Sequence, residues 1–275
     1  YFANITATLH AMSDSPMPSD PRIQEILKRL VVLVPAFNEE AALPGLLQEI
    51  AASLPGCDVC VVDDGSSDRT AEVAGAAGAR VLRLPCNCGV GVALRAGFID
   101  AIERGYGYLL RLDGDGQHPP GEALRLIRFM ADNPTDLVIG TRYGEGSSYH
   151  GTPFRRFTLK ILAAFVSLIC RKRSTDPTSG FWLISRPLLY GFAIHFPNDY
   201  PEAEALALLR RQGFSYDEVP VAFRPRAAGE TTINAWASII FALKVFLALF
   251  VDRLRRVDVR GSAGYIKRML EADHA

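Results

Sequence analysis

The sequence predicts an α/β fold built on a largely parallel β-sheet. Three observations support this prediction. Short apolar runs rich in Val and Leu recur through residues 29–140, and each is followed by a polar loop and then by a helical pattern. The first run, at residues 29–35, is apolar at nearly every position, which is typical of a strand covered on both faces. Strands that alternate with helices favour crossover units in a parallel sheet.

The first half of the chain predicts five strands separated by helices. The strands are expected at residues 29–35, 59–62, 80–84, 108–112 and 136–140. The helices are expected at about 40–53, 70–78, 90–104 and 121–132. Pro44 fits the first helix only if it lies in the first turn, because proline lacks a backbone N–H donor.

The second half predicts a looser alternation. After a loop at 141–150 we expect a helix at 154–169 and a strand at 181–185. A second helix at 201–212 and a second strand at 214–226 lead into a glycine-bearing loop at 226–232. No linker separates the halves, so we expect one domain over 29–232, an N-terminal lead-in at 1–28 and a C-terminal tail at 233–275.

An apolar C-terminal helix is expected at 235–251, interrupted only by Ser238 and Lys244. It is slightly short for a membrane span and carries a charge near its middle. An interfacial helix or oligomer contact, a packed core helix and a true span all stay open for this segment. The N-terminal stretch lacks the basic and apolar regions of a signal peptide.

Composition excludes some functions. The chain has 275 residues, 49% of them hydrophobic and 22% charged, with a formal net charge of zero, so no global feature indicates nucleic-acid binding. Five cysteines, an odd number, do not suggest a secreted disulfide framework. Cys57 with Cys60, and Cys86 with Cys88, have spacings that zinc sites use, but we expect the two pairs at opposite ends of parallel strands. Small buried thiols are the favoured interpretation.

The most informative stretch is 108–120, where an apolar run stops at Asp113 and continues as Gly114-Asp115-Gly116-Gln117. Two carboxylates separated by one glycine can turn hard oxygen ligands, with an amide oxygen, toward one point beyond the end of the strand. Such ligands suit Mg²⁺ or Mn²⁺, which often share their coordination with substrate phosphates. The alternative is a polar turn with no metal.

Polar loops after the other strands are expected to face the same crevice. Right-handed crossovers bring the loops that follow parallel strands to one edge of the sheet, where ligands of such folds bind. The side chains expected to meet there are those of Asn38, Glu39, Asp63, Asp64, Asn87, Asp113 and Asp115. Each turn alone could be structural, since Ser66, Ser67 and Asp68 are also good helix N-caps.

These motifs, taken in order, resemble those of family 2 glycosyltransferases, which have the GT-A fold with its Rossmann-like, mostly parallel central sheet and flanking helices. The motifs are Pro35-Ala-Phe-Asn-Glu39, Asp63-Asp-Gly-Ser-Ser-Asp68, Asn87 with Gly89 and Gly91, and Asp113-Gly-Asp-Gly-Gln117. A second set looks more narrowly like the polyprenyl-phosphate, dolichol-phosphate mannose synthase-like branch: Gly140-Thr-Arg-Tyr143, Pro153 with Arg155 and Arg156, and Asp176-Pro-Thr-Ser-Gly-Phe181. The likeness spans about residues 30–232.

The resemblance implies a binding site in three parts. The residues expected to bind a nucleoside-diphosphate sugar donor are Pro35, Ala36, Asn38, Glu39, Asp63, Asp64, Asn87, Asp113 and Gly114. The implied ligands of Mg²⁺ or Mn²⁺ are Asp113, Asp115 and Gln117. The candidates for contact with the acceptor are Arg142, Arg155, Arg156, Lys160 and Ser179. The candidate catalytic residues are Asp115, Asp176, Arg142 and Arg156.

The resemblance implies an inverting, metal-dependent transfer of a sugar to a polyprenyl phosphate at the cytoplasmic face of the membrane. A phosphate monoester, with a second pKa of about 6, is ionised near neutral pH and can attack without losing a proton. Arginines suit it because a guanidinium grips phosphate oxygens in a two-pronged way. We expect peripheral membrane contact and no nucleic-acid partner, and a homo-oligomer stays open.

A glycan or lipid-linked saccharide hydroxyl, used in cell-surface polysaccharide synthesis, is the alternative acceptor. A hydroxyl needs a general base, for which Asp176 is the first candidate and Glu202 or Glu204 the second. Asp176 could equally cap a turn. Departures from the branch, such as Lys160 where Ser is common, keep the sugar and the acceptor open. A non-catalytic nucleotide-binding protein is a further alternative, which the paired aspartates disfavour.

Overall fold

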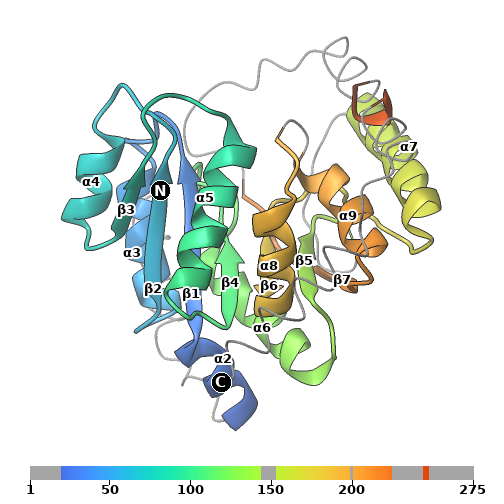
Figure 1. Cartoon of the computed structure of the whole chain (residues 1–275), viewed down its shortest axis with the longest axis horizontal. Helices are drawn as coiled ribbons and strands as arrows, with labels where there is room; N and C mark the ends of the chain where they lie inside the picture. Colours follow the sequence, from blue (N-terminus) through green and yellow to red (C-terminus); the bar gives the residue numbers. More distant parts are fainter. Residues whose placement is uncertain (1–19, 144–152, 199–200, 225–243, 248–275) are drawn as a thin grey trace.

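One seven-stranded β-sheet runs through the chain, with the strand order β3-β2-β1-β4-β6-β5-β7 (Figure 1). The computed structural model describes residues 20–143, 153–198, 201–224 and 244–247, with the side chains of helix α7 described from residue 157 onward. The strands are β1 (Leu30–Ala36), β2 (Asp58–Asp63), β3 (Arg80–Arg83), β4 (Tyr108–Arg111), β5 (Leu137–Thr141), β6 (Trp182–Ser185) and β7 (Tyr216–Pro220).

The sheet is parallel except for one strand. β1 pairs in parallel with β2 and β4, β2 with β3, and β5 with β7. Only β6 runs the other way, between β4 and β5, among the described strands. The carboxyl ends of the six co-directional strands therefore lie along one edge, which confirms the predicted mostly parallel sheet.

Helices cover both faces of the sheet (Figure 1). They are α2 (Pro21–Lys28), α3 (Leu43–Ser53), α4 (Thr70–Ala76), α5 (Val90–Glu103), α6 (Ala123–Asp132), α7 (Pro153–Cys170), α8 (Arg186–Ile194) and α9 (Pro201–Arg211), with a 3₁₀ turn η1 at Pro120–Glu122. Pro44 lies in the first turn of α3, as predicted.

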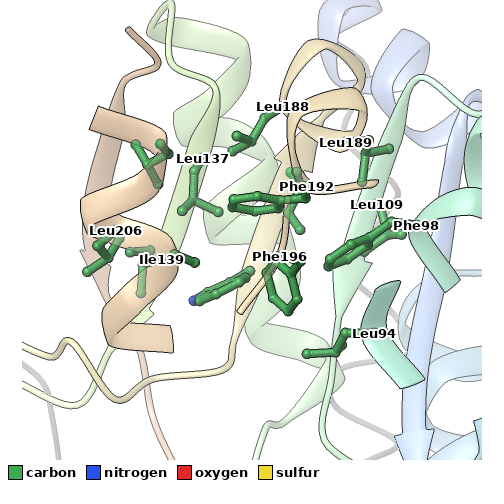
Figure 2. Packing of buried hydrophobic residues seen from close by; sticks show 14 of the residues in the cluster. Leu94, Phe98, Leu109, Leu137, Ile139, Leu188, Leu189, Phe192, Phe196 and Leu206 are labelled. Atoms are coloured by element: carbon green, nitrogen blue, oxygen red, sulfur yellow. The ribbon is translucent and has the colours of Figure 1, made fainter. Parts of the chain in front are cut away.

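Alternate residues of the central strands fill two separate cores. In β1, Val31 and Leu33 pack on the face covered by α5, α7, α8 and α9, whereas Val32 and Val34 pack on the face covered by α2, α3 and α6. Figure 2 shows the first core, where the rings of Phe98, Phe192 and Phe196 meet. A strand buried on both sides favours apolar residues on both faces, which explains the unbroken apolar run of β1.

Two helices are additions to the predicted elements. Helix α2 occupies the end of the expected lead-in, where Asp20 accepts a hydrogen bond from the Arg22 amide (2.8 Å) and Pro21 starts the helix. Helix α8 follows β6 directly and buries Leu188, Leu189 and Phe192. Both carry apolar residues at helical spacing, so the signal was present in short segments that the sequence analysis assigned to no element.

Several predicted boundaries were wrong. The strand expected at 214–226 is only Tyr216–Pro220, a sheet-edge strand that ends at a proline. Helix α3 starts at Leu43 rather than residue 40. The amides of Glu39 and Glu40, just before it, donate to Thr70 Oγ1 and Asp68 Oδ2. The loop at 226–232 and most of the helix predicted at 235–251 lie outside the described residues. In residues 244–247, which are helical, Val245 is fully buried and the Phe246 ring meets Phe165 at 4.4 Å.

The cysteines are distributed differently from the expectation. Cys60 and Cys170 are buried, but Cys86 and Cys88 are exposed because they lie on the loop beyond β3. Among the described residues, no helix is long and apolar enough to cross a bilayer.

Candidate active site

The loops after β1 and β2 are joined by hydrogen bonds from one loop to the other. Asn38 has a left-handed backbone (φ 56°), and its amide donates to Ser66 Oγ (2.9 Å) while its side-chain oxygen accepts from the Ser67 amide (2.9 Å). The Glu39 amide donates to Thr70 Oγ1 (2.8 Å). Asparagine tolerates this conformation better than most residues. The predicted donor residue Asn38 is thus held by the Asp63–Asp68 motif, and Glu39 by Thr70 just after it.

Asp64 fixes the third loop of this edge. Its two carboxylate oxygens accept hydrogen bonds from the amides of Cys88 (2.8 Å) and Gly89 (2.9 Å), and its own amide donates to the Ala36 carbonyl (2.9 Å). Asp63 is fully buried, accepts from the Ser66 amide (2.9 Å) and lies 3.3 Å from Arg83 Nε. These two aspartates therefore bind protein groups on three neighbouring loops.

The Asp113–Gln117 loop lies beside the end of β1. A Cβ added to Gly114 would stand 3.1 Å from the Pro35 carbonyl oxygen and 3.5 Å from both Ala36 Cβ and Glu39 Cγ. Only a glycine lets the loop come this close without displacing its neighbours. The structure therefore brings the aspartates together with the predicted donor loop.

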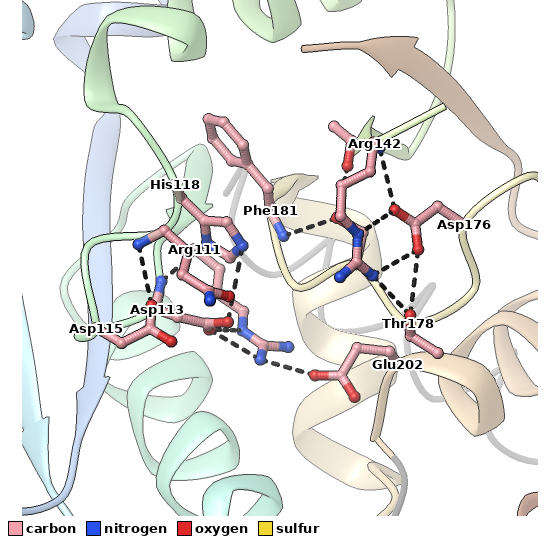
Figure 3. A network of polar contacts seen from close by, with 12 residues as sticks. Arg111, Asp113, Asp115, His118, Arg142, Asp176, Thr178, Phe181 and Glu202 are labelled. Atoms are coloured by element: carbon pink, nitrogen blue, oxygen red, sulfur yellow. Dashed lines mark hydrogen bonds and ion pairs between the residues drawn. The ribbon is translucent and has the colours of Figure 1, made fainter. Parts of the chain in front are cut away.

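A buried arginine ties the first aspartate to a distant helix. Arg111 is 2% exposed, and its guanidinium donates to Asp113 Oδ1 (3.2 Å from Nε and 3.0 Å from Nη2) and to Glu202 Oε1 in the first turn of α9 (2.8 Å) (Figure 3). The same guanidinium lies 5.2 Å from the centre of the Trp182 ring. A buried charge must be paired, so Arg111 constrains both carboxylates at once.

The histidine of the stretch is a structural acceptor in this arrangement. His118 is buried, and its Nδ1 accepts a hydrogen bond from the Asp113 amide (3.0 Å). Burial lowers the pKa of His118, with the nearby Asp113 carboxylate opposing the effect. Its ring stacks on Phe181 (5.1 Å) and meets the edge of Phe223 (5.3 Å). His118 is therefore a neutral imidazole that supports the Asp113–Gln117 loop by accepting its first amide hydrogen bond.

Asp115 and Gln117 complete the loop. Asp115 is 7% exposed and its Oδ1 accepts from the Gln117 amide (3.0 Å), while the Asp113 side chain is 34% exposed. Within the described ranges, no group of three or more His, Cys, Asp or Glu side chains forms a closed metal site. The carboxylates of Asp113 and Asp115, in the loop after β4, fit Mg²⁺ instead, since this ion is commonly held by one or two carboxylates and by substrate phosphates.

The candidate acceptor arginine is paired with the candidate base. Arg142 Nε and Nη2 each lie 2.7 Å from one oxygen of Asp176, and Nη2 also donates to Thr178 Oγ1 (2.7 Å) (Figure 3). Asp176 is 1% exposed. The Arg142 guanidinium lies 5.5 Å from the centre of the Phe223 ring, the same ring that meets His118. Phe223 thus links the arginine to the aspartate loop.

The other candidate residues differ in their burial and in the elements that carry them. Ser179 is buried, and its hydroxyl donates to the Gly140 carbonyl (2.5 Å), a contact inside the protein. Asn87 is exposed on the loop beyond β3, and Lys160 is exposed on α7. The side chains of Arg155 and Arg156 lie outside the described residues, although the backbone places both in the first turn of α7.

Sequence reasoning missed Arg111 as a site residue and named Glu202 only as a second choice of base. The available signal was a single arginine inside an otherwise apolar strand run, which implies a buried partner of opposite charge. Nothing in the sequence identifies that partner, because Glu202 is 91 residues away.

Gly180 provides a direct test of this packing. A Cβ at Gly180 would lie 2.7 Å from Arg111 Nη2 and 3.0 Å from Asp113 Oδ2, so Gly180→Ala must displace the buried ion pair. We expect the free energy of unfolding to fall by about 1–3 kcal/mol in urea denaturation. Gly45→Ala is the matched control, since nothing lies within 4 Å of its Cβ position in α3, and it should be neutral or stabilising. An unchanged stability for Gly180→Ala would contradict the described geometry.

Comparison with known proteins identifies the family. The chain is 30% identical to the polyprenol monophosphomannose synthase of Mycolicibacterium smegmatis, over 78% of this chain and 84% of that protein. It is 30% identical to the undecaprenyl-phosphate mannosyltransferase of Micrococcus luteus, over 75% and 88%.

The fold is that of solved glycosyltransferase structures as well. The chain superposes on the glucosyl-3-phosphoglycerate synthase of Mycobacterium tuberculosis in complex with Mg²⁺ and uridine diphosphate, with a TM-score of 0.65, 24% identity, and coverage of 85% of this chain and 84% of that one. This likeness confirms the predicted GT-A fold. The family model for glycosyl transferase family 2 matches residues 31–191. The chain therefore belongs to glycosyl transferase family 2, as its motifs predicted, and is a glycosyltransferase.

Proposed function

We propose that this glycosyltransferase moves a sugar, with inversion, from a nucleoside-diphosphate sugar to a polyprenyl phosphate. The observation that carries the proposal is the junction of three parts: the donor loops after β1 and β2, the Asp113–Gln117 loop beside them, and Arg142 next to that loop across Phe223. The two relatives named for polyprenol and undecaprenyl phosphate support this acceptor class.

The donor is proposed to bind along the edge formed by the first three loops. Pro35, Ala36, Asn38, Glu39 and Asp64 would line the pocket for the base and ribose, and the Asp113–Gly114 turn would face the diphosphate. The hydrogen bonds between these loops fix the backbone before any ligand arrives, which lowers the entropy cost of binding.

Asp113, Asp115 and Gln117 are the proposed residues for holding Mg²⁺ or Mn²⁺. The ion would supply positive charge where the leaving diphosphate becomes more negative. Arg111 would orient the Asp113 carboxylate, and His118 would hold the Asp113 backbone amide. The burial of Asp115 would restrict the orientation of its carboxylate. The structure of the relative bound to Mg²⁺ and uridine diphosphate supports a divalent ion in this fold.

The acceptor phosphate is proposed to meet Arg142, with Arg155, Arg156 and Lys160 adding positive charge. Asp176 and Thr178 hold the Arg142 guanidinium in one orientation, so the arginine is preorganised for a two-pronged grip. An ionised phosphate needs no base to attack the sugar. Both oxygens of Asp176 already accept from Arg142, which favours a phosphate acceptor over a hydroxyl that would need Asp176 as base.

Membrane contact is proposed through helix α7. Phe157, Ile161 and Leu168 are 62%, 45% and 74% exposed, and their spacing of four and seven residues places them on one face. Lys160 is exposed beside them, where a cation can meet anionic headgroups. A lipid acceptor requires the enzyme to approach a bilayer, and we propose that this helix does so at the cytoplasmic face. The expected homo-oligomer stays a prediction.

The activity is tested with purified protein, Mn²⁺, undecaprenyl phosphate and a panel of nucleotide sugars. We expect a lipid-linked sugar from at least one donor, detected by mass spectrometry. Asp115→Asn should lower turnover at least about 100-fold, because the leaving diphosphate loses its counter-charge. Glu72→Gln, at an exposed position of α4, is the control and should be neutral. Absence of product from every donor would contradict the proposal.

Asp176→Asn separates the two acceptor classes. If the acceptor is a phosphate, the substitution loosens Arg142, so KM for the acceptor should rise while kcat falls less than about ten-fold. If the acceptor is a hydroxyl and Asp176 is its base, kcat should fall by about 10²–10⁴ with donor binding intact. Steady-state kinetics with varied acceptor makes the distinction, and thermal unfolding checks that the variant folds.

Membrane contact is measured by flotation with vesicles that contain phosphatidylglycerol. Phe157→Glu and Leu168→Glu should each weaken binding to the vesicles roughly ten-fold. Each substitution removes apolar area that the bilayer would bury and adds a charge that anionic lipids repel. Ile99→Glu on α5, where the isoleucine is 41% exposed, is the matched control and should bind as well as the unchanged protein. Equal binding by all three variants would rule out the α7 face.

A further inference from the structure

The loop beyond β3 carries two exposed thiols that touch. Cys86 Sγ and Cys88 Sγ are 3.6 Å apart, and the Cys88 thiol also lies 3.3 Å from the Cys86 carbonyl oxygen. Both residues are exposed. A disulfide needs the sulfurs to come within about 2 Å, so joining these two sulfurs requires the 86–88 turn to change its shape.

The other thiols of the described chain are less reactive. Burial raises the pKa of Cys57, Cys60 and Cys170 to about 11 in each case. The thiolate is the nucleophile in disulfide exchange, so these three cysteines react slowly near neutral pH. The hydrogen bond with Cys86 raises the pKa of Cys88 as well, but Cys88 is solvent-accessible and has a second thiol beside it. Access and proximity therefore single out this pair.

The same turn is packed against the donor loop in two ways. The Cys88 amide is one of the two donors that hold the Asp64 carboxylate, the Gly89 amide being the other. Gly65 (φ +70°) lies on the Cys86–Asn87 peptide so closely that a Cβ there would be 2.3 Å from the Cys86 carbonyl carbon. Reshaping the turn must therefore move Asp64, Gly65 or both.

We propose that Cys86 and Cys88 form a redox-sensitive dithiol site that weakens binding of the nucleotide donor when it is oxidised. The effect on the donor rests on the proposed function, in which Asp64 belongs to the donor pocket. The oxidant class is a small disulfide such as glutathione disulfide.

The exchange runs in two steps that balance. One protein thiolate attacks the glutathione disulfide, forming a mixed disulfide and releasing one glutathione thiolate. The second protein thiolate attacks the protein sulfur of that mixed disulfide, forming the Cys86–Cys88 bond and releasing the second glutathione. The protein loses two electrons and two thiol protons, and one glutathione disulfide becomes two glutathione thiols.

The covalent step is read by mass spectrometry. Trypsin cleavage after Arg83 and Arg95 gives a peptide, residues 84–95, that contains both cysteines and no other. After treatment of the whole protein with glutathione disulfide and alkylation, we expect this peptide two hydrogen atoms lighter and unalkylated. A peptide 84–95 that stays fully alkylatable, or carries only glutathione, would overturn the proposal.

The functional step is read by calorimetry with a nucleoside diphosphate and Mn²⁺. Oxidation should weaken binding at least about five-fold, and reduction with dithiothreitol should restore it. Cys86→Ser and Cys88→Ser should each abolish the sensitivity, whereas the control Cys57→Ser should keep it. A disulfide that leaves the affinity unchanged would overturn the regulatory claim. Failure of the reduced protein to bind any nucleoside diphosphate would instead contradict the donor site, while the peptide mass still decides whether the dithiol site exists.

Discussion

The site depends on the hydrogen-bonded ion pairs that the buried guanidinium of Arg111 forms with Asp113 and Glu202. The guanidinium is enclosed by the Trp182 ring and by Gly180, whose missing side chain leaves it room, and it is neutralised by Asp113 and Glu202. Removing one partner of a buried ion pair commonly costs about 3–5 kcal/mol, because the other charge is left uncompensated. One side chain thus connects the aspartate loop to the first turn of helix α9.

The parallel sheet explains why acidic and amide groups from distant segments meet. β1, β2, β3 and β4 end at one edge, and their loops bind each other rather than standing apart: Asp64 holds the loop beyond β3, and Gly114 packs on the end of β1. The arrangement is preorganised, since the protein supplies its own partners for these groups. A ligand that enters such an edge meets fixed dipoles and charges, which is the most effective form of electrostatic stabilisation.

The sequence predicted most of what local rules control. Apolar runs located every strand of the first half to within two residues, and the rule on parallel crossovers predicted that the loop of Asp113 and the loop of Glu39 share one edge, where Gly114 packs beside Glu39. The sequence did not predict which charged side chains far apart along the chain would pair with each other. That Arg142 would engage Asp176, or Arg111 engage Glu202, depends on the antiparallel insertion of β6 and on how α9 packs, and neither follows from spacing along the chain. The short helix α8 was missed although its apolar residues have helical spacing, because a segment of nine residues is too short to distinguish that spacing from chance.

The central claim is that a divalent cation sits between Asp113 and Asp115 when a nucleotide donor is bound. Anomalous scattering from a crystal grown with Mn²⁺ and a nucleoside diphosphate measures this directly. The account predicts one strong peak at the mouth of the sheet, roughly 2.1 Å from carboxylate oxygens of this pair and from diphosphate oxygens. A bound nucleotide with no anomalous peak there, or a peak held by other side chains, would contradict it.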